Sequence, residues 1–126
     1  MVRVSHSPID PATAYGLITK EQAGSVVFHY AVVKEQGGHD GMTTGIEYRA
    51  AGDVEAELAE IAEELREKWK LEDVLLIRRT GRLGIGDIIS LVAASSPNSE
   101  DAFASCRHGI ARMKKMATIK KTETYG

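Results

Sequence analysis

The stretch SPNSEDAFASCRHGIARMKKMATIKK, residues 96–121, decides how the last third of the chain folds. It predicts a capped amphipathic helix that runs into an extended tail bearing lysines. Asn98 or Ser99 can supply the N-cap oxygen, and the acidic residues that follow favour the positive end of the helix dipole. Apolar residues recur at three- and four-residue spacing, which predicts one buried face. They are Phe103, Cys106, Ile110 and Met113.

Four lysines lie at the end of this stretch, namely Lys114, Lys115, Lys120 and Lys121. They concentrate positive charge locally, although the whole chain has a net charge of −2. Lysines at a helix C-terminus also favour the dipole, and a run of charge usually marks a solvated face. A solvated surface and a local anion-binding site both remain open from these residues alone.

Length and composition predict one domain that covers residues 1–126. A chain of 126 residues with 43% hydrophobic and 27% charged residues can bury a sizeable core. The slightly negative net charge argues against general attraction to nucleic acid or to a membrane surface. Any anion binding must therefore be local.

A single cysteine excludes an internal disulfide and a cysteine-rich zinc site. Cys106 falls on the apolar helix face, where a small buried hydrophobe is expected rather than a nucleophile. The N-terminus lacks the pattern of a signal peptide, and no apolar run approaches the ~18 residues that span a bilayer. We therefore expect a cytoplasmic protein.

The first third of the chain predicts a strand, a helix and a second strand. Residues 1–7 alternate as a short strand, and Asp10 caps a helix that begins with Pro11 and runs through residue 18. Residues 25–33 are almost continuously apolar, which predicts a central strand. His29 lies within it, and it is either a core or interface histidine or a ligand or acid–base group.

Residues 34–42, KEQGGHDGM, predict a mobile loop. The His39-Asp40 pair stands alone, so no metal site is expected. Residues 43–50 then alternate as a half-buried strand with Ile46, Tyr48 and Ala50 on one face.

Asp53 caps the clearest helix, whose buried stripe is expected to comprise Val54, Leu58, Ile61, Leu65 and Trp69. On its exposed side, Glu64 and Lys68 stand four residues apart and can pair. Residues 73–79 predict a strand, the glycines of residues 81–87 a tight connection, and residues 88–94 another strand. This order predicts an α+β fold with helices packed on a mixed or antiparallel sheet.

The residue types limit the kinds of reaction and binding that the protein could perform. The sequence has no recognisable nucleophile triad, paired carboxylates or metal-ligand cluster. Lysine, arginine and a glycine-rich loop hold anions, polarise carbonyls and donate protons when an ammonium pKa is lowered. The residues alone therefore indicate an anion-binding α+β domain.

An ordered set of segments resembles the large, catalytic subunit of molybdopterin synthase, the MoaE family. The segments are GSVV (24–27), GIEY (45–48), AEIA (59–62), RTGRLGIGD (79–87), AFASC (102–106), MK (113–114) and KTE (121–123). They cover nearly the whole chain in the family's order and spacing.

This resemblance implies an α/β-hammerhead fold and a homodimer. It implies that a small ubiquitin-like sulfur carrier docks on each subunit and inserts its C-terminal glycine thiocarboxylate. The enzyme would then move two sulfurs, one per carrier, onto cyclic pyranopterin monophosphate to form the molybdopterin dithiolene. The resemblance implies neither a metal nor a cofactor for this step.

The family's two pocket lysines fall on Lys114 and Lys121. The resemblance implies that Lys114 polarises the thiocarboxylate or supplies a proton, and that Lys121 neutralises the substrate phosphate or a developing oxyanion. Lys34 stands where the family usually has an arginine that binds substrate. Asn98 and Ser99 replace a histidine–arginine pair and are assigned to substrate binding, and Lys115 and Lys120 are assigned there as compensating charges.

Two other functions remain. The missing histidine–arginine pair motivates a paralogue that keeps the dimer and carrier-docking surfaces without turnover. A nucleic-acid binder that uses the lysine tail is disfavoured, because aromatic residues do not alternate with the basic ones.

Overall fold

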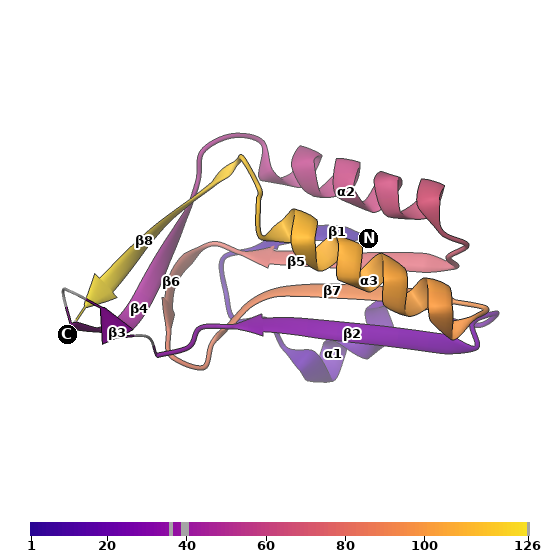
Figure 1. Cartoon of the computed structure of the whole chain (residues 1–126), viewed down its shortest axis with the longest axis horizontal. Coiled ribbons are helices and arrows are strands. Elements are labelled where there is room, and N and C mark those ends of the chain that lie inside the picture. The colour runs from indigo at the N-terminus through magenta and orange to yellow at the C-terminus, as the bar shows by residue number, and fades with distance from the viewer. Residues whose placement is uncertain (36, 39–40, 126) are drawn as a thin grey trace.

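The computed structural model describes residues 1–35, 37–38 and 41–125. Its elements run in the order β1, α1, β2, β3, β4, α2, β5, β6, β7, α3 and β8. Two sheets organise the fold, with helices against the larger one (Figure 1). The predicted α+β class is confirmed.

The larger sheet has the strand order β1-β5-β7-β2. Its strands are β1 (Val2–Ser5), β5 (Asp73–Arg79), β7 (Ile88–Ser96) and β2 (Ser25–Val32). β1 runs parallel to β5, whereas β7 is antiparallel to both β5 and β2, so the sheet is mixed.

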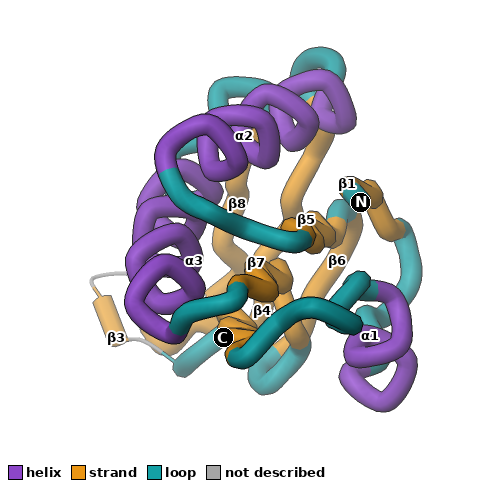
Figure 2. Tube along the Cα trace, turned by 90° about the vertical axis from the view of Figure 1, so that its right-hand side faces the viewer, coloured by secondary structure: helices purple, strands orange, loops and turns teal. Residues whose placement is uncertain are grey.

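Helices cover both faces of this sheet. α2 (Val54–Lys68) and α3 (Ser99–Met113) lie on one face, and α1 (Pro11–Leu17) lies on the other (Figure 2). Asp10 and Asp53 are N-caps as the sequence predicted, Asn98 rather than Ser99 caps α3, and each side chain accepts a hydrogen bond from a backbone N–H of the first turn.

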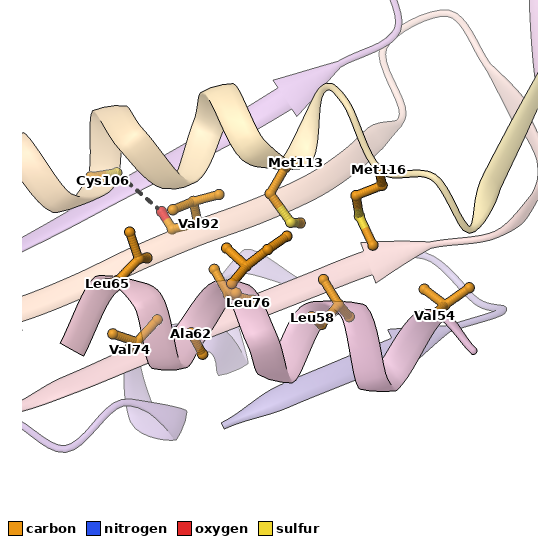
Figure 3. Packing of buried hydrophobic residues seen from close by; sticks show 11 residues of the cluster. Val54, Leu58, Ala62, Leu65, Val74, Leu76, Val92, Cys106, Met113 and Met116 are labelled. Atoms are coloured by element: carbon orange, nitrogen blue, oxygen red, sulfur yellow. Dashed lines mark hydrogen bonds between the residues drawn. The ribbon is translucent and has the colours of Figure 1, made fainter. Parts of the chain in front are cut away.

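The main core fills the space between the sheet and the α2–α3 pair (Figure 3). Leu58 and Leu65 of α2 are fully buried against Leu76 and Val92 of the central strands. Cys106 of α3 joins this cluster as a buried side chain, and its Sγ lies 3.5 Å from the carbonyl oxygen of Val92. The expectation of a buried, structural cysteine is confirmed.

The smaller sheet lies beyond one end of the larger sheet (Figure 1). Its long strand β4 (Gly41–Ala50) pairs with β6 (Gly81–Gly84) and with β8 (Ile119–Tyr125), and the two-residue β3 (Gly37–Gly38) pairs with its start. Residues 45–48 pair with both β6 and β8, so β4 is the middle strand there.

Two expectations about strands were wrong. β2 is an edge strand rather than a central one, because its apolar sequence reflects cover on both faces and not a neighbour on both edges. The glycine-rich connection after β5 contains the strand β6, whereas the expected extended tail is the strand β8. The pairing of both with β4 is long-range and leaves no local periodicity.

One expectation about a helix was also wrong. Phe103 is 61% exposed and lies outside the buried face of α3. Glu64 accepts hydrogen bonds from His108 and from Arg112 of α3, and the positive charge of Lys68 also lowers the pKa of its carboxyl. Trp69 packs partly buried against the core, with its ring centroid 5.4 Å from that of His108.

The predicted loop at residues 34–42 is only partly described, and His39 and Asp40 lie outside the described residues. Within the described part, Gly38 and Gly41 are paired residues of β3 and β4. None of the helices in the described ranges has the length and apolar character needed to cross a membrane.

Candidate functional site

A cavity of about 560 Å³ lies where strands of both sheets meet the C-terminal end of α3. Strands β2, β5 and β7 of the larger sheet line one side, and β4 and β8 of the smaller sheet line another. Four of its lining side chains are cationic and one is acidic. The cations are Lys34, Arg78, Lys114 and Lys121, and the acid is Glu123.

Lys114 reaches the cavity from the end of α3, where it is the C-cap residue. Its backbone N–H donates to the carbonyl oxygen of Ile110 at 3.1 Å, so the last helical turn fixes its position. Met113 is buried one residue earlier and anchors the same turn in the core. A cation at a helix C-terminus also lies at the negative end of the dipole.

Lys121 reaches the cavity from β8, where it pairs with Tyr48 of β4. Alternate residues of a strand share a face, and Ile119, Lys121 and Glu123 all line the cavity. The Lys121 ammonium lies 3.2 Å from a carboxylate oxygen of Glu123, and its side chain is 51% exposed. An incoming anion can therefore reach it.

Glu57 of α2 holds the turn that leads from α3 into β8. Its two carboxylate oxygens accept hydrogen bonds from the backbone N–H groups of Ala117 and Thr118, each at 3.0 Å. The Thr118 hydroxyl donates to the same carboxylate at 2.6 Å. Burial alone would raise the pKa of Glu57, but these hydrogen bonds outweigh it and the pKa lies below its ordinary value.

Lys34 lines the cavity just after β2. Its neighbour Val33 is buried, and the backbone of Val33 exchanges hydrogen bonds with Asp87 and Gly86 at 3.0 and 2.8 Å. The structure therefore brings Lys34, Lys114 and Lys121 to one cavity from three separate elements.

The other four residues assigned from the sequence lie outside this lining. Asn98 and Ser99 stand at the opposite end of α3 from Lys114, and the Asn98 side-chain oxygen accepts from the Asp101 N–H at 2.8 Å. Lys115 and Lys120 are exposed and do not line the cavity.

Sequence reasoning missed several lining residues, above all Arg78, Tyr48 and Ser90. The Arg78 guanidinium carbon lies 4.3 Å from the centroid of the Tyr48 ring, and Arg78 is only 6% exposed. Burial lowers the pKa of this guanidinium, although an arginine remains charged near neutral pH. The available signal was an arginine directly after the apolar run of residues 74–77, inside a predicted strand.

The arrangement favours binding of anions. Cations converge on a partly enclosed space, where an ion pair is stronger than in open solvent. Within residues 1–35, 37–38 and 41–125, no cluster of three His, Cys, Asp or Glu side chains could hold a metal ion.

The family model described as "MoaE protein" matches residues 4–116. The chain belongs to the MoaE family. A molybdopterin synthase catalytic subunit of Bacillus subtilis is 28% identical over 123 residues, which cover 97% of this chain and 78% of that protein. The protein of the same name from Staphylococcus carnosus is 39% identical over 71 residues, 56% of this chain. That match covers 47% of the S. carnosus protein, about half its length.

Solved structures share the MoaE fold. The crystal structure of molybdopterin synthase from Staphylococcus aureus has a TM-score of 0.89 at 31% identity and covers 98% of this chain and 90% of that one. A complex of subunits 1 and 2 of molybdopterin-converting factor from Helicobacter pylori has a TM-score of 0.68 at 13% identity, covering 97% and 83%, and shows the fold alone. The α/β-hammerhead fold class expected from the sequence is confirmed.

Proposed function

We propose that this protein is the catalytic subunit of a molybdopterin synthase. It transfers sulfur from the C-terminal thiocarboxylate of a small ubiquitin-like carrier to cyclic pyranopterin monophosphate and so forms the molybdopterin dithiolene. The observation that carries the proposal is the meeting of Lys114 and Lys121 in one cavity, from a helix end and from a strand. Membership of the MoaE family supports it.

The two lysines take different roles in this mechanism. Lys114 polarises the thiocarboxylate of the carrier or supplies a proton to it. Lys121 neutralises the oxyanion that develops as sulfur is transferred, and Lys34 adds attraction for the phosphorylated substrate. Preformed cations in a partly water-excluded site stabilise developing negative charge without reorganising during the reaction.

The proposal includes two protein partners and a cytoplasmic location. One partner is the carrier, whose flexible glycine tail enters the cavity, and the H. pylori complex of two subunits supports such a pairing in this fold. The other partner is a second copy of the chain. Light scattering of the purified protein, alone and with carrier, measures both assemblies.

The direct test combines the purified protein with thiocarboxylated carrier and cyclic pyranopterin monophosphate and measures the dithiolene product. We expect product that depends on the thiocarboxylate, with unmodified carrier as the control. Absence of product from folded protein with its own carrier would contradict the proposal.

A specific observation favours a second candidate, a paralogue that binds carrier without turnover. The Asn98 side chain is committed to capping α3, so it does not replace a proton-carrying histidine in this cavity. This candidate predicts carrier binding that survives Lys114→Ala and no product. Turnover that depends on Lys114 excludes it.

A further inference from the structure

Two residues that line the cavity each contain a buried nitrogen without a hydrogen-bond partner. Among the described residues, three buried side-chain nitrogen atoms are unpaired, and two of these, Arg78 Nε and His29 Nδ1, belong to lining residues. A buried polar group without a partner is costly, so such atoms call for an explanation. A ligand that supplies the missing partners is one.

The register of the larger sheet places these groups on one face. Arg78 of β5 pairs with Ser90 of β7, and Ser90 pairs with Ala31 of β2, so the three residues form one row across the sheet. His29 stands two residues from Ala31 and shares its face. On the same face, Leu76 and Val92 of the neighbouring row belong to the main core. The row of Arg78, Ser90 and Ala31 therefore lies where this core ends and forms a wall of the cavity.

The surroundings of Arg78 favour binding of a ligand over an internal ion pair. No carboxylate of the described residues forms a salt bridge with it, and its guanidinium lies over the Tyr48 ring. Tyr48 also forms a side-chain hydrogen bond with the guanidinium, whereas Arg78 Nε remains a donor without a partner in the part of the chain that the structure describes. A guanidinium offers five N–H donors, so an incoming acceptor with several oxygens fits it.

Arg79, the next residue of the same strand, is a second buried arginine with which Arg78 can be compared. It is 8% exposed, and its Nη1 lies 3.5 Å from a carboxylate oxygen of Asp87 while its Nη2 donates to the Arg82 carbonyl at 3.3 Å. Its Nε is unpaired as well, but its charge has a partner within the fold. Among the described residues, the charge of Arg78 faces Tyr48 and has no carboxylate partner.

We propose that Arg78, with Ser90 and His29, forms a phosphate-binding site at the inner end of the cavity. A phosphate group presents oxygens in several directions and can accept from a guanidinium, a hydroxyl and an imidazole together, whereas the fork of one arginine already satisfies a planar carboxylate. This inference rests on the proposed function: it assigns the substrate phosphate to Arg78 and leaves Lys121 for the developing oxyanion.

The test measures binding of inorganic phosphate to the full chain by ³¹P nuclear magnetic resonance, without carrier or turnover. Glycylglycine serves as a second probe, because it carries the carboxylate of a carrier tail but no phosphate. The variants are Arg78→Gln, the conservative Arg78→Lys and Ser90→Ala, with Arg79→Gln as the matched control. Circular dichroism checks that each variant is folded.

We expect Arg78→Gln to weaken phosphate binding at least about tenfold, Ser90→Ala to weaken it less, and Arg79→Gln to leave it unchanged. Arg78→Lys should retain part of the affinity, because it keeps the charge without the fork. Unchanged phosphate binding in folded Arg78→Gln, or loss confined to glycylglycine, overturns the proposal. Phosphate binding that depends on Arg78 in a protein without sulfur transfer upholds this site while refuting the proposed function.

Discussion

Glu64 of α2 accepts a hydrogen bond from Arg112 of α3 at 2.6 Å, two residues before the cavity lysine Lys114. The same carboxylate bonds to His108, one helical turn earlier on α3. The two helices are therefore joined by a charged contact beside their apolar interface, close to the end of α3 that carries Lys114. The position of Lys114 depends on α2 as well as on its own helix.

Replacing Glu64 with glutamine should lower the melting temperature at neutral pH. Hydrogen bonds from His108 and Arg112 lower the pKa of the Glu64 carboxyl, so its contribution is present above the ordinary carboxyl pKa. That contribution is lost as the pH falls through the lowered native pKa. Thermal unfolding of wild type and Glu64→Gln at pH 7 and in acid measures the difference, which should shrink in acid. The exposed Glu63→Gln serves as control, and an equal effect in that variant would contradict the role of the contact.

Replacing Lys114 or Lys121 with alanine should reduce sulfur transfer by about 100-fold or more, the typical effect of losing a proton-transfer or oxyanion-stabilising group. Lys115→Ala and Lys120→Ala remove the same charge from adjacent positions outside the lining and should cost less. Single-turnover dithiolene formation measures all four. Equal losses would show that total charge, rather than position, governs the reaction.

Glu57→Gln should impair the site although Glu57 does not line the cavity, because Glu57 fixes the turn that precedes β8. Loss of the carboxylate weakens three hydrogen bonds and should lower the free energy of unfolding by about 1 kcal/mol. Turnover should fall with Lys121 still present. Glu60→Gln, an exposed change on the same helix, is the control. Unchanged turnover and stability in Glu57→Gln would show that the turn holds without it.

Cys106 should resist thiol reagents in the native protein. Burial raises the pKa of its thiol to about 11 and shields the sulfur from the reagent, so little reactive thiolate is present at neutral pH. Labelling with a maleimide, followed by mass spectrometry, should show reaction only after denaturant is added. Fast labelling of the native chain would contradict the buried position and would reopen a role for the thiol in sulfur transfer.

Local signals in the sequence predicted local structure well. Asp10 and Asp53 were identified as helix caps, and the cap of α3 was limited to Asn98 or Ser99, because a cap is decided within one turn. Elements that depend on distant partners were missed. β6 contains two glycines in four residues and is a strand only because β4 lies beside it.

The candidate site likewise contains residues that were predicted from the sequence and residues that were missed. Lys114 and Lys121 were assigned by resemblance, and the structure places both at the cavity. Arg78 was not found, because the residues that share its wall of the cavity, Ser90, His29 and Tyr48, come from three other strands whose register no single segment encodes. Phe103 shows the opposite error: its spacing fits the buried stripe of α3, yet its side chain is 61% exposed.

The pairing of β8 with β4 makes neighbouring lysines non-equivalent. Lys121 lies opposite Tyr48 and Lys120 lies opposite Arg49, so consecutive ammonium groups emerge on opposite sides. Deleting or inserting a single amino acid between Met116 and Ile119 would exchange their orientations while leaving the formal charge and the lysine count as they were. The register of β8 against β4, rather than the number of basic residues, therefore determines which lysine lines the cavity.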